Sequence, residues 1–449
     1  MPTTDAIYAA VEAREEEMGA FLREFLAIET ENPPGRNYRE GATFLAEAMR
    51  PRGYDVEIVE VPTDRVAEHY PERTDHERVN VLGRKGDNPS GRDEPGERDD
   101  LGGGGEPRES DEPGEGDDSG PHVHFTGHFD VVPAGEDWTR DPYTPTVEEG
   151  RVYGRGSSDM KSGITASLFA VDALEAAGVD IEGSITQSTT VDEETGGFTG
   201  LGYLVEEGYV SPDNTDYCVY TECFDASRIC LGHRGVLKFH VSTHGEKAHG
   251  CMAHDGANAV AAMTDFLTRI ETYEADLHER TTEQPVTPDA SRRADISPTM
   301  VDAGYSENVV PDRCRATFYR VLVPGETVAS ARREIRELMA DTEQATGQTV
   351  EYEEIMFAEP TTVPADCTIA ETYTDRILDF YDETEPVVSP GSDDQRFVVN
   401  DAGIEECIVY GPGLLQQAHV VDEYVPIDQL VTATKVMAAS TADLMGVVE

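Results

Sequence analysis

Positive charge is scarce in this sequence. Its 449 residues include 35 lysines and arginines against 90 aspartates and glutamates, which gives a net charge of −55 at pH 7. Lysine is the rarer cation and occurs only at Lys85, Lys161, Lys238, Lys247 and Lys435. A field of this sign repels phosphate groups, so we expect neither nucleic acid nor an anionic membrane among the partners.

The scarcity of lysine also bears on the surroundings of the protein. Strong acidity with few lysines, in a chain whose apolar patterning is ordinary, resembles the proteins of salt-accumulating halophiles. In such cells the salt screens the repulsion between surface carboxylates. The alternative interpretation is an unusually acidic protein of a mesophile.

Paired cysteines and long apolar segments are missing as well. The seven cysteines are odd in number, scattered and without a Cys-x-x-Cys spacing, so they indicate neither a disulfide scaffold nor a thiolate zinc site. No apolar run approaches the roughly 20 residues needed to cross a bilayer. Residues 1–30 carry acids where a signal peptide needs basic residues, and they predict an amphipathic helix. We therefore expect a cytoplasmic protein.

The order of predicted helices and strands indicates two domains. Residues 1–232 and 359–449 alternate helices such as "GITASLFAVDALEAAG" with strands such as "GSITQSTTV", which predicts a mostly parallel sheet flanked by helices. Residues 233–358 follow the order β-α-β-β-α-β, which predicts an inserted ferredoxin-like α+β domain. The predicted fold class is therefore α/β with an α+β insertion.

One segment of the first domain differs in composition from the rest. Residues 86–120 are rich in Gly, Pro, Asp and Glu and contain one leucine as their only large apolar residue. Such a segment buries too little apolar surface to offset the entropy of ordering, so we predict a disordered acidic loop. It joins two predicted strands, "RVNVLGR" and "HVHFTGH", and we expect it to ornament a hairpin.

Residues with metal-binding side chains stand at the ends of predicted strands or in adjoining loops. In a parallel α/β sheet such loops meet in a crevice, where catalytic residues are expected. The candidates are His128 and Asp130 in "GHFDVVPAG", Asp159 in "GRGSSDMKSG", Glu193 and Glu194 in "TVDEETGG", Glu222 in "YTE" and His419 in "GPGLLQQAHVVDE". Each has an ordinary explanation by itself: an incidental His-x-Asp pair, a helix N-cap at Asp159, or solvated charges.

Taken together, these side chains suit a pair of metal ions. One His, one Asp and one Glu for each cation, with one carboxylate shared, fits two zinc-like ions about 3.5–4 Å apart. Such a pair lowers the pKa of a bridging water and polarises a carbonyl group. A further carboxylate that binds no metal must then carry the proton to the leaving amine. Two adjacent glutamates can divide these tasks.

The five motifs, in this order, resemble those of the co-catalytic metallohydrolases that include acetylornithine deacetylase, succinyl-diaminopimelate desuccinylase, aminoacylase and carboxypeptidase G. The resemblance covers nearly the whole chain and implies two divalent ions, zinc with cobalt or manganese as alternatives. It implies these roles: His128 and Glu222 bind one metal, Glu194 and His419 the other, Asp159 bridges them, Asp130 orients His128, and Glu193 is the general base and acid.

The same resemblance gives the inserted domain a role in dimerisation. The segment "STHGEKAHGCMAHDGANAV" is similar to the family segment whose histidine reaches the active site of the other subunit and polarises the scissile carbonyl. His249 occupies that place, which implies a homodimer joined through this domain as a lid. The ordinary alternative is a surface histidine near a strand end.

The predicted substrate-binding residues depart from the family pattern. Asn308 stands where relatives have a substrate-contacting asparagine, but thirteen residues later, where they have an arginine for the substrate carboxylate, the residue is Val321. Arg320 is one step away, on the opposite face of a strand. Either a bulge restores Arg320 to the site or Arg396 takes its place. Gly413, in a Gly-Pro-Gly turn, is a further candidate.

The resemblance implies hydrolysis of the amide bond of an N-acyl amino acid by a metal-activated water. A dipeptidase or carboxypeptidase of the same family is the alternative. A glycosidase with paired carboxylates needs neither His128 nor His419. A non-catalytic relative is disfavoured because every metal position and the Glu193 position are filled.

Overall fold

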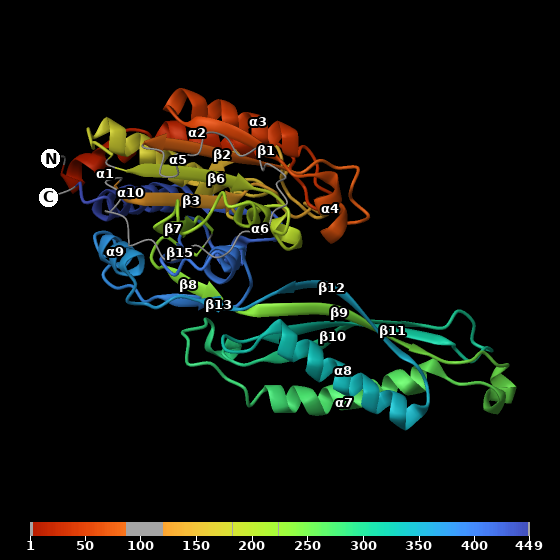
Figure 1. Ribbon diagram of the computed structural model, residues 1–449. Coiled ribbons are helices and arrows are strands. Elements are labelled where there is room, and N and C mark those ends of the chain that lie inside the picture. Colours follow the sequence, from red (N-terminus) through yellow and green to blue (C-terminus); the bar gives the residue numbers. More distant parts are fainter. Residues whose placement is uncertain (1–2, 87–119, 182, 223, 448–449) are drawn as a thin grey trace, which may run out of the picture.

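The computed structural model describes residues 3–86, 120–181, 183–222 and 224–447. These residues form a large unit around a nine-stranded sheet and a small unit, from Gly235 to Ala358, around a four-stranded sheet (Figure 1). The predicted α/β fold class with an α+β insertion is confirmed. The predicted acidic loop, apart from its ends, lies outside the described residues.

The large sheet has the strand order β1-β2-β6-β3-β7-β15-β8-β13, and β14 pairs with β8 off this path. Its strands are β1 (Asp55–Glu60), β2 (Val79–Gly86), β3 (His122–His128), β6 (Ser184–Thr190), β7 (Tyr217–Tyr220), β8 (Cys230–His233), β13 (Thr361–Thr362), β14 (Val387–Ser389) and β15 (Cys407–Val409).

The large sheet is mixed, which corrects the prediction of a mostly parallel one. The central strands β6, β3, β7 and β15 run parallel, whereas β2 and β8 are antiparallel to the strands they flank. Antiparallel neighbours need no helical crossover, so the sheet grows at its edges without further helices. Strand β6 lies between β2 and β3, so the acidic segment does not connect a hairpin as predicted.

Helices cover both faces of this sheet (Figure 1). One face packs against α1 (Thr4–Glu12), α2 (Glu15–Leu26), α3 (Tyr38–Met49), α5 (Lys161–Ala176), α9 (Thr368–Ile377) and α10 (Ile427–Leu444), and the other against α4 (Thr63–His69) and α6 (Leu201–Glu206). Successive strand residues point to opposite faces, so Phe125 of β3 joins the first core and Tyr220 of β7 the second. Helix α5 is buried on nearly every side, which explains its apolar composition.

A three-stranded sheet lies beside the carboxyl ends of the central strands. It consists of β4 (Thr146–Glu148), β5 (Arg151–Tyr153) and β16 (Tyr424–Pro426), in the order β16-β5-β4. Because β5 precedes Asp159 and β16 follows His419, the pairing of β5 with β16 brings these two loops together.

The short helices are η1 (Arg50–Arg52), η2 (Glu193–Thr195), η3 (Gly250–Asp255), η4 (Asp289–Ser291), η5 (Phe397–Asp401) and η6 (Leu415–Gln417).

The small unit is an antiparallel sheet backed by two helices. Its elements are β9 (Gly235–His244), α7 (Ala259–Leu277), β10 (Asp295–Ala303), β11 (Arg313–Leu322), α8 (Val328–Thr346) and β12 (Val350–Ala358). The strand order β10-β11-β9-β12 is that of a ferredoxin-like sheet. Helix α8 begins with a capping box between Thr327 and Ser330 and ends at Gly347, whose φ of 69° suits a residue without Cβ.

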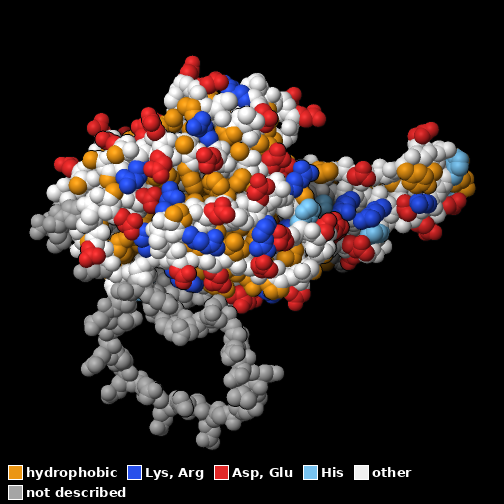
Figure 2. Space-filling model, turned by 90° about the horizontal axis from the view of Figure 1, so that it is seen from above, with side chains coloured by type: hydrophobic (Ala, Val, Ile, Leu, Met, Phe, Trp, Pro, Cys, Tyr) orange, Lys and Arg blue, Asp and Glu red, His pale blue; other side chains and the backbone are white. Residues whose placement is uncertain are grey.

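The surface agrees with the composition. In the face shown in Figure 2, Asp and Glu side chains are spread over both units, with fewer Lys and Arg among them. Within the described ranges, no helix combines the length and the apolar character needed to cross a membrane. The six cysteines in those ranges are free, and Cys223 lies outside them.

Candidate active site

Four of the predicted metal ligands meet at the carboxyl edge of the large sheet. His128 ends β3, and Glu194 lies in η2, which follows the adjacent parallel strand β6. Asp159 stands between the two histidines: its Oδ1 is 3.2 Å from Nε2 of His128, and its Oδ2 is 3.1 Å from Nε2 of His419. Nε2 of His419 is also 3.0 Å from Oε2 of Glu194. Ligand atoms of His128, Asp159 and Glu194 lie within 4.8 Å of one another.

Glu222 joins the same edge after β7, the other parallel neighbour of β3. Its Oε2 is buried and has no hydrogen-bond partner among the described residues. Burial raises the pKa of Glu222 well above its usual value, and the charges of Asp159, Asp393 and Glu193 add to this effect. A buried polar atom without a partner is rare in native proteins, so this oxygen is the kind of group that a ligand completes.

The adjacent glutamates differ in their contacts. Glu194 is held at both oxygens, because Oε1 accepts from the backbone N–H of Val132 at 3.1 Å and Oε2 contacts His419. The carboxylate of Glu193 accepts no hydrogen bond within the described part of the chain, and its Oε2 lies 3.8 Å from Nε2 of His128. Burial raises the pKa of Glu193 well above the usual range, although His128 opposes the shift. Glu193 therefore favours a proton more strongly than a surface glutamate does.

The two histidines are surrounded by an excess of carboxylates. Burial disfavours the charged form of His128, but its contacts with Asp130 and Asp159 outweigh burial and raise its pKa well above the usual value. Contacts with Asp159 and Glu194 raise the pKa of His419 to about 11. The site thus stabilises positive charge, and its nitrogen and oxygen donors are those that zinc-like ions prefer. The residues present fit a pair of divalent cations.

Asp130 lies behind His128 and connects it to the glutamate pair. Nδ1 of His128 hydrogen-bonds the backbone oxygen of Asp130 at 2.9 Å and lies 3.5 Å from the Asp130 carboxylate. That carboxylate accepts from the backbone N–H groups of Glu193 and Glu194, each at 3.3 Å, and from the side-chain amide of Asn32 at 2.9 Å. Asp130 therefore positions both His128 and the η2 turn.

The structure also identifies positioning residues that the sequence did not. Glu423 is fully buried and accepts from Arg155 at 2.5 Å and from the backbone N–H groups of Ser158 and Asp159 at 2.8 and 3.1 Å. It holds the loop that carries Asp159. Glu423 follows His419 closely in the sequence, but in so acidic a chain nothing local distinguishes a buried glutamate from a solvated one.

His249 and Asn308 lie together, but far from this cluster within one chain. His249 forms an isolated β-bridge with Val309, and the N–H of Gly250 donates to the backbone oxygen of Asn308 at 2.7 Å. Strand β9 leaves the large unit at its first residue, and His249 follows its distal end (Figure 1). His249 is exposed there.

Arg320 does not reach the cluster. Strand β11 pairs with β9 without a register shift, so the bulge considered above is not formed, and Arg320 faces the helices opposite Leu237. It is fully buried, with Nη2 at 2.6 Å from Glu326 and Nε donating to Tyr273 at 3.2 Å. The strand alternation places Tyr319 and Val321 on the other face of the sheet.

Arg396 and Gly413 are engaged by the protein itself. The two terminal nitrogens of Arg396 donate to the backbone oxygens of Asp393 and Gly196, at 2.5 and 2.6 Å. Because Gly196 follows η2, Arg396 holds the turn that carries the glutamate pair. The N–H of Gly413 donates to the side chain of Gln429 at 3.2 Å.

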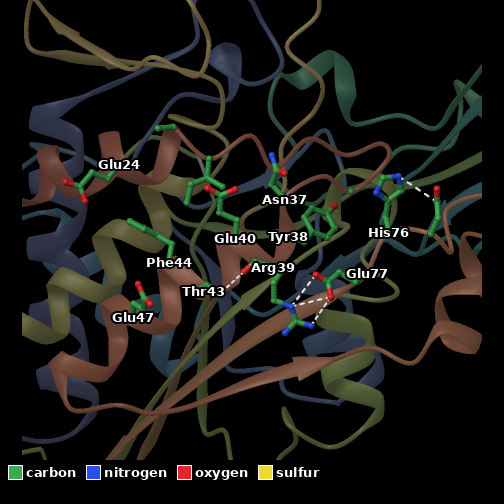
Figure 3. Close-up of a pocket in the computed structure, with 14 residues that line it drawn as sticks. Glu24, Asn37, Tyr38, Arg39, Glu40, Thr43, Phe44, Glu47, His76 and Glu77 are labelled. Carbon is green, nitrogen blue, oxygen red and sulfur yellow. Dashed lines mark hydrogen bonds and ion pairs between the residues drawn. The ribbon is translucent and has the colours of Figure 1, made fainter.

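A surface cleft adjoins this cluster. A cleft of about 400 Å³ between the units is lined by Glu194 and by residues of the small unit. A hollow of about 1000 Å³ beside α3 is lined by no predicted site residue. There, Arg39 points toward Glu77 and hydrogen-bonds it (Figure 3). We therefore place the candidate site at the cleft.

The chain is similar to known proteins over most of its length. The family described as "Peptidase family M20/M25/M40" matches residues 124–443. The chain is 31% identical over 332 residues to a succinyl-diaminopimelate desuccinylase from Methylobacterium radiotolerans, covering 71% of this chain and 80% of that protein. It is 29% identical over 341 residues to the enzyme of that name from Gluconacetobacter diazotrophicus, covering 73% and 82%.

Solved structures share the fold. An M20 family metallo-carboxypeptidase from Sulfolobus solfataricus superposes with a TM-score of 0.72 at 19% identity, covering 96% of this chain and 99% of that one. A di-peptidase from Saccharomyces cerevisiae gives 0.72 at 16% identity, covering 99% of both chains. A dinuclear metal-binding peptidase of the M20 family from Bacillus subtilis gives 0.62 at 13% identity, covering 97% and 100%.

Proposed function

Since the chain belongs to peptidase family M20/M25/M40 and is a hydrolase of amide bonds, we propose that its substrate is an N-acyl amino acid, which it cleaves to a carboxylate and an amino acid. The observation that carries this proposal is the division between the two adjacent glutamates. One of them, Glu194, is held against His419, whereas the other, Glu193, ends in a carboxylate that is 13% exposed and accepts no hydrogen bond from the described residues.

We assign the metal-binding roles that the family resemblance implies. His128 and Glu222 would hold one cation, Glu194 and His419 the other, with Asp159 between them. Bound zinc, cobalt or manganese would polarise the scissile carbonyl and make a water acidic enough to attack it. The Oε2 of Glu222, which has no hydrogen-bond partner among the described residues, and the excess of carboxylates around two imidazoles support this assignment.

Glu193 would act as the proton carrier. Its raised pKa suits a group that takes a proton from the attacking water and delivers it to the departing nitrogen. Asp130 holds the backbone of Glu193 with its carboxylate and the ring of His128 with its backbone oxygen, and Asn32 fixes that carboxylate in turn. These contacts preorganise the proton carrier relative to the cluster.

The small unit would form a homodimer and act as a lid, so that His249 serves the site of the other subunit. Two observations support this proposal. His249 is exposed at the distal end of the small unit, and edge strand β10 with the following loop exposes Met300, Val301 and Tyr305 at 68%, 57% and 71%. Figure 2 shows hydrophobic side chains gathered toward that end. Unpartnered apolar residues on an edge strand are typical of an interface.

A subunit-mixing experiment tests the shared site. Glu193→Ala and His249→Ala dimers should each be inactive. After mixing and exchange, the heterodimer has one complete site, so about a quarter of wild-type activity should return if pairing is random. No recovery despite demonstrated exchange would contradict a site shared between subunits.

A substrate panel tests the reaction itself. N-acetyl-ornithine, N-acetyl-lysine, N-succinyl-diaminopimelate and short peptides should be assayed side by side in multimolar KCl, before and after metal removal. We expect turnover of the N-acyl amino acids that is lost with the metal and restored by zinc, cobalt or manganese. Turnover of peptides alone would instead indicate a dipeptidase or carboxypeptidase. Activity that survives complete metal removal would contradict the metal roles.

A further inference from the structure

The cleft between the two units is lined by two cations that form no ion pair with a carboxylate of the described residues. From the large unit it is lined by Glu194, Tyr70 and Arg73, and from the small unit by Lys238 and Met356. Glu194 belongs to the proposed metal cluster. The cleft therefore opens beside the predicted reaction centre, where a bound substrate would extend.

Lys238 differs from every other lysine of the chain. Three of the others form ion pairs with carboxylates, and the fourth donates to two backbone carbonyls. The ammonium of Lys238 has neither kind of partner within the described ranges and lies over the ring of Tyr319, 5.2 Å from its centroid. Among the five lysines, Lys238 alone has neither a carboxylate nor a carbonyl partner among the described residues.

The strand register directs Lys238 into the cleft. Lys238 lies opposite Tyr319 on β11 and opposite Met356 on β12, which also lines the cleft. The neighbouring pair, Leu237 and Arg320, points the other way, into the helix layer. The sheet therefore presents Lys238, and not Arg320, to a substrate.

The environment of Lys238 favours an anionic ligand. Burial lowers the pKa of Lys238, while Glu193 and Glu194 act in the opposite direction. A half-buried ammonium without a hydrogen-bond acceptor is poorly compensated for the water it has lost. A carboxylate placed against it would supply a charge-assisted hydrogen bond.

Arg73 provides a second cation from the opposite wall of the cleft. It lies over the ring of Tyr70, at 5.6 Å from the centroid, and its Nη1 donates to Oδ1 of Asn32 at 3.4 Å. No carboxylate in the described parts of the chain forms an ion pair with it. Since Asn32 also contacts Asp130, the guanidinium reaches toward the cluster.

The carboxylates on the cleft walls leave these two cations free. Arg332 donates hydrogen bonds to both carboxylate oxygens of Glu354, at 2.7 and 2.6 Å, so the charge of Glu354 is already neutralised. Glu72 is exposed and forms no ion pair with a described residue. Glu194 is committed to the proposed cluster.

We propose that Lys238 and Arg73 form a subsite that binds a carboxylate of the substrate and so restrict the enzyme to anionic N-acyl amino acids. This inference rests on the proposed function above. Lys238 and Arg73 thus take the role that the sequence suggested for Arg320, which instead forms an ion pair with Glu326. Local cations matter here because the overall field of the protein repels anionic substrates.

Matched substrates identify the carboxylate that is bound. It belongs either to the amino acid or to a dicarboxylic acyl group such as succinyl. The Lys238→Met enzyme should be compared with the wild type on the N-succinyl and N-acetyl forms of one amino acid, and on the α-amide of the N-acetyl form. If Lys238→Met weakens the affinity for the N-succinyl substrate only, the subsite binds the carboxylate of the acyl group. If the affinity falls for both acids but not for the amide, the subsite binds the α-carboxylate.

The expected effect is a rise in KM of about 10- to 100-fold, the usual range for a hydrogen bond to a charged group, with little change in kcat. Lys238→Arg should restore most of the affinity. Lys85→Met removes a lysine of the large unit that is paired with Glu175, and it should change nothing. An equal rise in KM on all three substrates, or no rise on any, would overturn the inference.

Succinate binding separates this inference from the proposed function. Calorimetry should show at least tenfold weaker binding of succinate to Lys238→Met than to the wild type. If the wild type cleaves no N-acyl amino acid but succinate binding depends on Lys238, the proposed function fails and the anion subsite stands. If cleavage is observed and succinate affinity is unchanged in Lys238→Met, the subsite alone is wrong.

Discussion

Glu193 and Glu194 should respond differently to the same substitution. Changing either residue to glutamine keeps its volume and removes its charge. Glu194 contacts Nε2 of His419 at 3.0 Å and accepts from Val132, whereas Glu193 has no such contacts among the described residues. Glutamine at position 194 therefore removes a predicted ligand, and glutamine at position 193 removes a predicted proton carrier.

The expected magnitudes follow from these roles. Loss of a general acid and base lowers turnover by about 10²–10⁴-fold, so Glu193→Gln should lower kcat by that factor while keeping about two metal ions per chain. Replacing an outer-shell partner weakens metal binding by about 10–100-fold, so Glu194→Gln, which alters a direct ligand, should weaken it by at least as much.

The assay is metal analysis by mass spectrometry after dialysis, run beside steady-state kinetics on the same preparations. The chain offers a matched control in Glu206-Glu207, another adjacent pair, which is exposed at the end of α6. Glu207→Gln should keep both activity and metal. Equal metal loss in Glu193→Gln and Glu194→Gln would refute the division of roles, as would full activity in Glu193→Gln.

Three further predictions concern stability. The pKa of His124 is lowered to about 3 because the ring is fully buried, so the unfolded chain binds a proton below pH 6.5 that the folded chain does not. The free energy of unfolding should therefore fall by about 1.4 kcal/mol per pH unit as the pH drops from 6.5 toward 3. Urea unfolding of His124→Gln should show a smaller fall over the same pH range, and an equal fall in the wild type and the variant would contradict the prediction. Arg78→Met should destabilise the protein by about 3–5 kcal/mol, because it leaves fully buried Asp192 without the guanidinium now 2.5 Å away. In denaturant titrations, the double variant Arg78→Met/Asp192→Asn should lose less stability than the sum of the two single variants. If the losses of the single variants simply add, the two side chains do not stabilise each other. The thermal midpoint should rise from 0.1 M to 1 M KCl, over which the screening length shrinks from about 10 Å to about 3 Å, and a midpoint independent of KCl would exclude carboxylate repulsion as a limiting factor.

Much of the site was predictable because its residues are marked by local pattern. A strand end with His128, a glycine-rich loop with Asp159 and a glycine pair after Glu194 are each short-range features, and parallel strands bring such ends to one edge. The small unit was predictable for the same reason, since its strands and helices follow in order and pair antiparallel.

Other features depended on contacts between distant segments. The positioning role of Glu423 arises from its burial against the loop of Asp159, more than 260 residues earlier in the chain. The antiparallel strands at the edges of the large sheet depend on the pairing of β6 with β2, and the hydrophobic pattern alone does not specify this pairing.

The sequence by itself therefore determined the fold class, the family resemblance and the donor types at the strand ends, because these follow from local periodicity and from motifs in a fixed order. The tertiary structure alone decided which charges face the substrate. On β11 and β9 the register sends Arg320 into the helix layer and Lys238 into the cleft. It also placed His249 beyond the end of β9 that is distant from the large unit, at an exposed position. A single step along a strand reverses the face, and only the packed sheet shows which face is buried.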